Sequence, residues 1–285
     1  MIDEMRALPQ TFQNFDQALS SLDWQMGITT TDATNGELPH AAPSLQGSLS
    51  PLGSDPNTRI IQKNDVNVNE EFFSTIVRRE TLACAFSPEN PCGSPFPQPM
   101  AVSILAMQKR NGDNANFFRP DADLAIVVIS DKDEMGDGKS FNPTKPEAVV
   151  SYFNSLWSNT TKSLHGFGII TQPGDAACLA QLRKKWPWDP NYGTFAQHLA
   201  DITGGMTTSI CSSDYSQNFS DIALALNPQL TTITLKATPI PGSVHISFTP
   251  TPSTPISWSV SGNVIKLNPP PPPGTVVTVN YQVAQ

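Results

Sequence analysis

The sequence predicts an α/β protein: a doubly wound, mostly parallel sheet flanked by helices, followed by a small antiparallel β domain. Helical and strand-like segments alternate over residues 1–227, which is typical of a parallel sheet covered on both faces. The run at 124–129 is apolar throughout, as in a central strand of such a sheet. After Pro228, short segments alternate apolar and polar residues between prolines and glycines. We therefore place an α/β domain at 1–227 and a small β-sandwich-like module at 228–285.

The first part of the chain predicts a helix, a strand and a long loop. Apolar residues recur every three or four positions over 2–22, which indicates an amphipathic helix, with Pro9 starting a turn or kink. Residues 23–32 (DWQMGITTTD) are typical of a strand that ends in hydroxyl side chains. The segment 33–58 is rich in Gly, Pro and Ser and has no periodicity, so we expect a loop.

The remaining elements follow from periodicity and from their boundary residues. We expect helices at 69–83, 100–110, 145–157, 192–205 and 215–226, and strands at 123–130, 165–171 and 207–211. Between the first two of these helices, residues 84–99 form a proline-rich loop. In the module, strands are expected within 231–239, 243–250, 257–268 and 275–284.

Composition restricts the partners and the compartment. The chain has a net charge of −8 and a pI of about 4.9, so its surface repels phosphate backbones and we expect no nucleic acid partner. The sequence has no apolar run of about 18 residues, so it predicts no transmembrane segment. Residues 1–10 lack the basic and apolar regions of a secretory signal peptide, although an exported protein is expected to have one.

The four cysteines favour disulfides over a metal site. Cys84, Cys92, Cys178 and Cys211 form no C-x-x-C motif, and no histidine lies near them at zinc-ligand spacing. The simplest pairing is 84–92 and 178–211, but the sequence leaves three pairings open. Disulfides favour an extracytoplasmic protein, and the alternative is four free thiols in the cytosol.

The stretch LAIVVISDKDE (124–134) supplies the main candidate site. In open parallel sheets, ligands bind outside the carboxyl ends of the strands, and Ser130, Asp131, Asp133 and Glu134 lie at such an end. Hard divalent cations prefer carboxylate and hydroxyl oxygens. We therefore predict a metal site at Asp131, with hydroxyl ligands from the threonines around Thr30 and from Ser94 in the proline-rich loop.

Three other interpretations of the acids remain open. The pair Asp131 and Asp133 resembles the D-x-D of haloacid-dehalogenase-like phosphotransfer enzymes, but Met135 stands where a Thr is expected. A calcium loop starting at Asp131 would lack a carboxylate at its fifth position and the Glu at its twelfth, where Asn142 stands. The third interpretation is a solvated loop after a strand. The sequence contains no G-x-S-x-G, H-E-x-x-H or P-loop motif.

Four stretches together resemble bacterial von Willebrand factor A-like (VWA) domain proteins, which are typically exported and often lipoproteins. They are DWQMGITTTD, FFRPDADLAIVVISDKDE, YGTFAQHLADITGGMTTSIC and SDYSQNFSDIALAL. The tail from PIPGSVHISFTP to TVVTVNYQV resembles the small β module that commonly follows this domain. The resemblance covers nearly the whole chain through the order and spacing of these stretches.

The resemblance implies a metal-ion-dependent adhesion site (MIDAS) that binds Mg²⁺, or Mn²⁺ or Ca²⁺ in its place. Asp131 matches the Asp after the family's fourth strand, and Ser94 lies in the loop that carries a Thr ligand. Asp133 and Asp32 would support the ligands without contacting the metal. The family's D-x-S-x-S motif is absent. Because the chain starts in the helix that follows this motif, we expect Met1 to be its last residue, with the first strand and any signal peptide upstream.

Three functions are therefore expected from the sequence. The first is a non-catalytic adhesion module that binds a protein or cell-surface ligand through a metal site that is incomplete in this chain. The second is a metal-free structural or assembly domain of an exported protein, and the third a phosphoesterase using Asp131 and Asp133. We expect the protein in the periplasm, on the outer-membrane surface or secreted, and a lipid anchor would lie in residues before Met1. Without its first strand, the sheet should leave two neighbouring strands unpaired.

Overall fold

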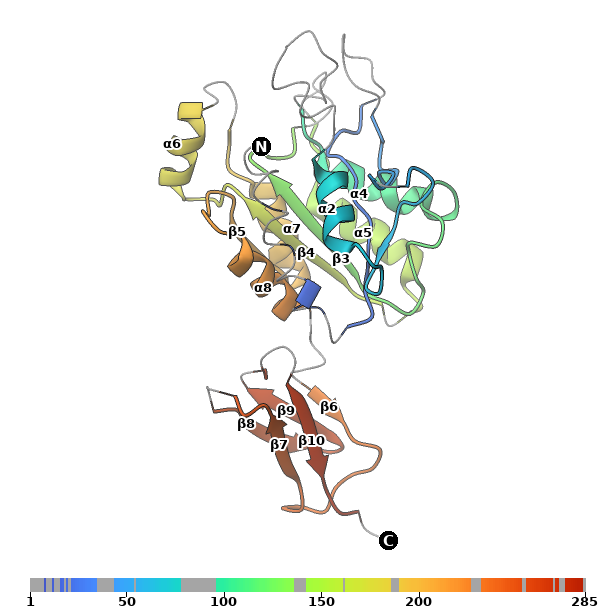
Figure 1. Cartoon of the computed structure of the whole chain (residues 1–285), viewed down its shortest axis with the longest axis vertical. Coiled ribbons are helices and arrows are strands. Elements are labelled where there is room, and N and C mark those ends of the chain that lie inside the picture. The colour runs from blue at the N-terminus through green and yellow to red at the C-terminus, as the bar shows by residue number, and fades with distance from the viewer. Residues whose placement is uncertain are drawn as a thin grey trace.

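A computed structural model gives the fold of the chain, which is α/β with small antiparallel sheets (Figure 1). The structure describes residues 8, 12, 16, 17, 19, 22–34, 44–53, 55–77, 96–135, 142–160, 162–185, 190–226, 232–252, 255–268, 270–271 and 275–283. No helix in these ranges is long and apolar enough to cross a membrane.

A three-stranded parallel sheet forms the centre of the α/β domain. Its strands lie in the order β3 (Leu124–Ser130), β4 (Leu164–Ile170) and β5 (Met206–Ser209). The register places Ser130 beside Ile170 and Ile170 beside Ser209, so the carboxyl ends of all three strands meet at one edge. The sequence predicted each of these strands to within two residues at either end.

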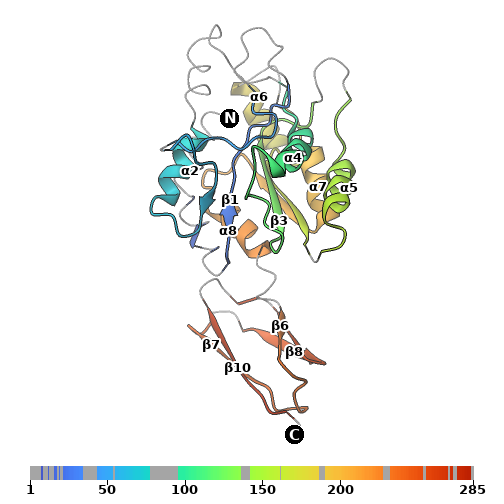
Figure 2. The same ribbon diagram turned by 90° about the vertical axis from the view of Figure 1, so that its right-hand side faces the viewer.

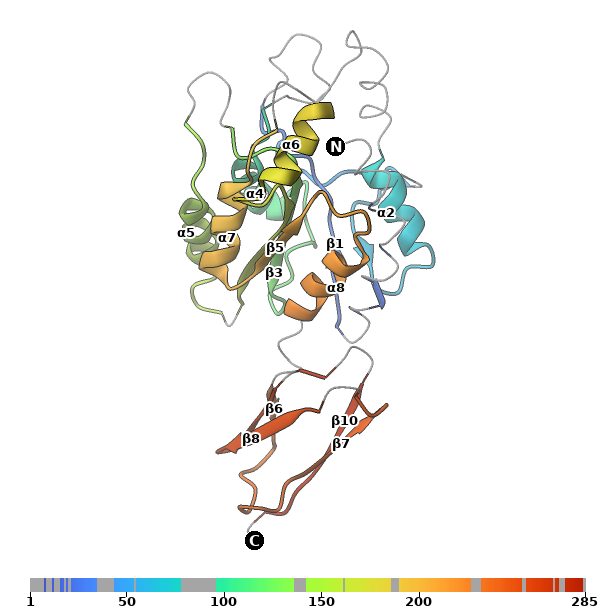
Figure 3. The same ribbon diagram turned by 90° about the vertical axis from the view of Figure 1, so that its left-hand side faces the viewer.

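Helices cover both faces of this sheet, as Figures 2 and 3 show from opposite sides. On one face lie α4 (Pro99–Gln108), α5 (Pro146–Trp157) and α7 (Thr194–Thr203). Their buried side chains pack with Val128 of β3 and Leu164 of β4. On the other face, α2 (Val68–Ile76) and α8 (Ser216–Ala225) pack around Phe167 and Ile169 of β4. Side chains that alternate along β4 therefore enter two different cores.

The helices expected at 100–110, 145–157, 192–205 and 215–226 are present, but two predictions need correction. Helix α2 ends at Ile76, well before the expected residue 83. Helix α6 (Ala176–Lys185), which buries Cys178, Leu179 and Leu182, was not predicted. One signal could have located it: Asp175 Oδ1 accepts the Cys178 N–H at 3.0 Å, as an N-cap residue does.

The strand expected over 23–32 is mostly not a strand. Only β1 (Gln25–Met26) forms a ladder, and it pairs antiparallel with β2 (Ile61–Gln62), which the sequence did not predict. Beyond β1 the backbone bonds to loops: Ile28 O accepts the Ser50 N–H at 2.6 Å. The polar-apolar pattern was that of a strand, but backbone partners decide whether a ladder forms.

The expected N-terminal helix lies largely outside the described residues. Its described positions Leu8, Phe12, Asp16 and Gln17 are helical. Phe12 is fully buried and stacks on Phe72 of α2, with 3.7 Å between ring centroids. These contacts place the helix against the same core as α8.

A disulfide joins Cys178 of α6 to Cys211, just beyond β5, with 5.6 Å between the Cα atoms. This is one of the two bonds in the simplest pairing from the sequence. The other two cysteines, Cys84 and Cys92, lie outside the described residues. The Cys178–Cys211 bond links α6 covalently to the sheet beside the Phe167 core.

The five strands after residue 231 gather at the end of the molecule that carries the C-terminus (Figure 1). They are β6 (Thr232–Thr234), β7 (His245–Thr249), β8 (Ser257–Ser261), β9 (Val264–Asn268) and β10 (Val276–Asn280). They form two antiparallel sheets, ordered β10-β7 and β6-β9-β8. Leu235, Val244, Ile265 and Leu267 are buried between them, in a core separate from the two of the α/β domain. The expected boundary at 227/228 falls outside the described residues.

Strand β3 has one open edge in the described part of the chain. It pairs with β4 on one side, and no described strand pairs with its other side. Val127, in the middle of this apolar strand, is 36% exposed. The sequence predicted a central strand here, but among the described strands β3 lies at the edge of the sheet and β4 at its centre. An apolar strand with an exposed valine is unusual for a parallel sheet, whose strands are normally buried.

Candidate binding site

The candidate site lies at the carboxyl ends of β3 and β4. Asp131 and Thr171 follow these strands directly, and the turn before α7 spans both. The Asn191 N–H donates to Asp131 O at 3.3 Å, and the Gly193 N–H donates to Thr171 O at 2.9 Å. This turn therefore links the carboxyl ends of β3 and β4 through backbone hydrogen bonds.

Asp131 is buried, with only 7% of its surface exposed. The neighbouring Ser130 is also buried, and its hydroxyl oxygen accepts the Lys132 N–H at 3.1 Å. Thr171 is fully buried, and its Oγ1 has no hydrogen-bond partner among the described residues. Buried polar atoms normally have partners, so this hydroxyl is an exception among the described residues.

Three segments predicted to carry ligands meet at this edge. The Gln98 N–H donates to Thr31 O at 2.6 Å, and the Met135 N–H donates to Pro97 O at 2.8 Å. Residues 97–98 thus lie between the segment that contains Thr30 and the segment that follows Asp131. Ser94 itself lies outside the described residues, three positions before Pro97.

Thr30 and Asp32 bond mainly within their own loop. The half-buried Thr30 accepts the Asp32 N–H on its Oγ1 at 3.4 Å. Asp32 is buried, and its Oδ1 accepts both the N–H of Thr34 at 2.8 Å and the hydroxyl of Thr34 at 2.6 Å. These two hydrogen bonds from Thr34 to the Asp32 carboxylate stabilise the conformation of the loop.

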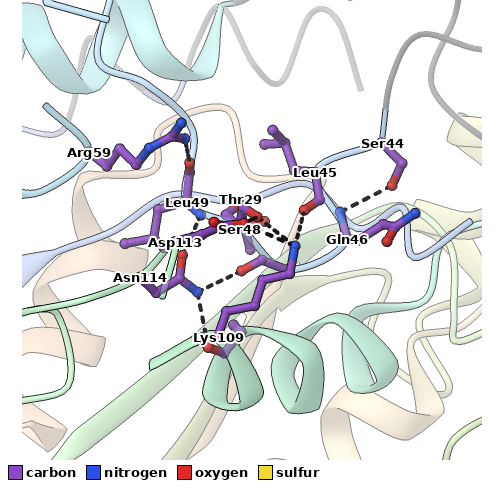
Figure 4. A network of polar contacts seen from close by, with 12 residues as sticks. Thr29, Ser44, Leu45, Gln46, Ser48, Leu49, Arg59, Lys109, Asp113 and Asn114 are labelled. Carbon is purple, nitrogen blue, oxygen red and sulfur yellow. Dashed lines mark hydrogen bonds and ion pairs between the residues drawn. The ribbon is translucent and has the colours of Figure 1, made fainter. Parts of the chain in front are cut away.

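Hydrogen bonds to neighbouring segments hold this loop in place (Figure 4). The Thr29 hydroxyl donates to Ser48 O at 2.9 Å, and the Ser44 hydroxyl donates to Asp32 O at 2.6 Å. The Lys109 ammonium, just after α4, donates to Ser48 Oγ at 2.6 Å. The loop that contains Thr30 is thus tied to residues 44–48, and these are tied to the end of α4.

Asn114 completes this network from the other side (Figure 4). Its Nδ2 donates to Gly47 O at 2.9 Å and Ala106 O at 3.0 Å, and its Oδ1 accepts the Leu49 N–H at 2.9 Å. Gly47 has φ +82°, and a Cβ there would lie 2.5 Å from Ala106 N, so only glycine fits. Asn114 and Lys109 were not predicted as part of the site, because Gly47 and Ser48, with which they bond, lie more than 60 residues away in the sequence.

Asp133 forms the N-terminal cap of α7. Its Oδ2 accepts the Thr194 N–H at 2.9 Å and the Thr194 hydroxyl, and its Oδ1 accepts the Phe195 N–H at 2.9 Å. The Asp133 N–H donates to Asn191 Oδ1 at 2.6 Å. A carboxylate at this position satisfies free N–H groups and interacts favourably with the helix dipole. Asp133 therefore ties the segment after β3 to α7.

Glu134 plays a similar role at α4. It is 5% exposed, and its Oε2 accepts the Met100 N–H at 2.7 Å, in the first turn of that helix. Its Oε1 is buried and has no partner of normal hydrogen-bond geometry in the described part of the structure. Burial raises the pKa of Glu134 to about 7, against the opposing effect of the backbone N–H groups at the start of α4.

The oxygen atoms at this edge are of the chemical type that binds a hard cation, but too few of the described acidic residues lie together. Carboxylate and hydroxyl oxygens, such as those of Asp131 and Thr30, are ligands that Mg²⁺ prefers. Within the described ranges, however, no three His, Cys, Asp or Glu residues lie close enough together to hold a metal ion.

Comparison with known proteins adds no assignment. No protein-family model matches the chain, and no curated protein matches it. Function must therefore be argued from the site itself.

Proposed function

We propose that this chain is a non-catalytic adhesion module of the VWA type, with a doubly wound sheet, that binds a protein or cell-surface ligand. The observation that supports this most is the meeting of three segments at the carboxyl edge of the sheet. The hydrogen bond from Met135 to Pro97 joins the two loops that the resemblance assigns to the adhesion site, and the hydrogen bond from Gln98 to Thr31 joins the second of these loops to the segment that contains Thr30. Ligand binding at this edge is the general rule for open α/β sheets.

The proposed site uses a divalent cation, with Mg²⁺ as the first candidate and Mn²⁺ or Ca²⁺ as others. Asp131, Thr30 and Ser94 would hold it, while Asp133 and Asp32 keep their loops in place. When bound, the cation offers an open coordination position to a carboxylate of the ligand.

The open edge of β3 supports an additional strand in this proposal. A further strand that carries D-x-S-x-S would pair with β3, cover Val127 and bring its oxygens to Asp131. Strand pairing would also satisfy the backbone groups along β3 that have no ladder partner among the described residues. The proposed metal site and the proposed sheet are then completed by the same segment.

An extracytoplasmic location fits this function. The Cys178–Cys211 disulfide is of a kind that persists mainly in oxidising compartments. The periplasm, the outer-membrane surface and the medium all meet this condition.

One observation favours the alternative of a metal-free structural or assembly domain. Asp133 and Glu134 already bind the first turns of α7 and α4, so two of the three acids after β3 have a structural role. The same contacts weigh against a phosphoesterase that uses Asp131 and Asp133. Both oxygens of Asp133 accept backbone N–H groups, so both are already engaged at the start of α7.

Metal-dependent thermal stability separates the proposal from the metal-free alternative. We would melt the full-length protein, including any residues encoded upstream of Met1, with and without millimolar Mg²⁺ or Mn²⁺. A bound ion at 100 times its Kd should add about 2.7 kcal/mol to the unfolding free energy. Asp131→Asn should remove this gain, and Asp201→Asn, at the far end of α7, should keep it. No gain in the full-length protein would refute the metal site and favour the alternative.

A further inference from the structure

Strand β8 leaves an apolar edge open in the C-terminal module. Its sequence, Ser257–Ser261 (SWSVS), alternates serine with Trp258 and Val260, and all five residues are exposed. Trp258 is 42% exposed and Val260 37% exposed. Both side chains lie on the face that holds the buried Ile265 and Leu267 of β9, because the register pairs them directly.

The open side of β8 also presents free backbone groups. Ser261 pairs with Val264 across the two-residue turn at Gly262 and Asn263, so this closing pair exchanges backbone hydrogen bonds with β9. In an antiparallel ladder, hydrogen-bonded and non-hydrogen-bonded pairs alternate. The N–H and C=O groups of Trp258 and Val260 therefore point away from β9, toward the edge that no described strand occupies.

This edge lacks the usual protection against pairing. Exposed edge strands normally carry a charge, a proline or a bulge. Ser257–Ser261 contains no charged residue and no proline. All 25 Asp and Glu residues of the chain precede residue 228, and Lys236 and Lys266 are the only charged residues after it. Repulsion between two modules is therefore weak despite the net charge of −8.

We propose that β8 pairs antiparallel with β8 of a second copy of the chain, about a two-fold axis at Ser259. This register places Trp258 opposite the partner's Val260, and the two exchange the backbone hydrogen bonds that point outward from each strand. Ser259 faces its counterpart in a non-hydrogen-bonded pair on the outer face. The two three-stranded sheets then form one continuous sheet. Trp258 and Val260 of both copies lie next to one another on one face of it.

The symmetry explains why a second copy fits better than an unrelated strand. A two-fold interface requires that the same patch be complementary to itself. The sequence SWSVS meets this requirement, since the axis at its central serine matches serine with serine and tryptophan with valine. The contact is small, so we expect a weak dimer with Kd on the order of 10⁻⁴ M.

Sedimentation equilibrium of the full chain, from micromolar to near-millimolar concentration, tests the dimer. Val260→Pro removes an outward N–H from each copy while leaving the ladder with β9 intact, because proline is tolerated where the N–H faces solvent. With two net hydrogen bonds lost across the interface, dimerisation should weaken by about thirtyfold. A chain that stays monomeric over the whole range would overturn the proposal.

A charge-swap experiment tests the register without changing the backbone. Ser259→Lys places like charges at the axis and should weaken the dimer about threefold to fivefold. An equimolar mixture of Ser259→Lys and Ser259→Glu should recover the wild-type affinity or exceed it. The matched control Ser257→Lys, on the same exposed face but off the axis, should keep the wild-type affinity. Equal effects at 257 and 259, or no recovery in the mixture, would rule out the axis at Ser259.

Discussion

Strands β3 and β8 each have one edge without a partner among the described strands, but their surroundings differ. The carboxyl end of β3 is followed by three acids, and two of them bind the first turns of α7 and α4. The edge of β8 is followed by a tight turn and lies in a module that has no acidic residue. At the end of β3, two carboxylates bind the neighbouring helices. Strand β8 itself has only serine and apolar side chains, and Lys266 of the adjacent β9 pairs with Ser259.

Acidic residues therefore have two separate structural roles in this chain, whose net charge is −8. Some remain on the surface, whereas Asp133 and Glu134 accept hydrogen bonds from backbone N–H groups inside the α/β domain. The module relies on its apolar core and on its ladders alone. Substitutions in the α/β domain and in the module should therefore differ in how they change stability and its pH dependence.

The largest effect should come from removing one core side chain in each region. Phe167→Ala should lower the unfolding free energy of the α/β domain by about 3–5 kcal/mol, because it leaves a cavity in a buried aromatic cluster. Ile265→Ala should lower that of the module by about 2–5 kcal/mol for the same reason. Calorimetry should show that each substitution shifts one transition only. A common shift of both transitions would mean that the two regions unfold as one unit.

The second-largest effect should be a pH dependence of the stability of the α/β domain. The module should lack it. The pKa of Glu134 is raised from 4.5 to about 7 by burial, so the folded state binds its proton more tightly than the unfolded state does. The contribution of Glu134 to stability is therefore fully present below about pH 4.5 and is lost as the pH rises through about 7, a change of at most about 3 kcal/mol. Glu134→Gln should flatten this fall in urea titrations over that range. The exposed Glu70→Gln should leave it unchanged, and an unaltered fall in Glu134→Gln would contradict the assignment.

The smallest effect should come from the cap of α7. Asp133→Ala removes the acceptor for the Thr194 and Phe195 N–H groups and should destabilise the α/β domain by roughly 1–2 kcal/mol. The same substitution at Asp201, near the other end of α7, should change the stability by less than about 0.5 kcal/mol. Chemical denaturation measures both variants. If the two substitutions have equal effects, Asp133 acts only as a surface charge.

Part of the candidate site could be predicted from the sequence. The apolar run 124–129 located β3, and its end located Asp131, because a buried strand and its first polar residues are local features. The roles of Asp133 and Glu134 were not predictable in the same way. Their hydrogen-bond partners lie 61 and 34 residues away, at Thr194 and Met100, and only folding brings them together.

The sequence by itself determined the α/β class, most of the helices, the three parallel strands and the strands of the module. These follow from periodicity and from turn residues, which act within a few positions along the chain. Tertiary structure alone decided that residues 27–32 form loop contacts instead of a ladder, and that Lys109 and Asn114 fix the segment containing Thr30. It also decided which strand edges remain open at β3 and β8. Pairing depends on which backbone groups meet in space, and one-dimensional patterns do not encode that.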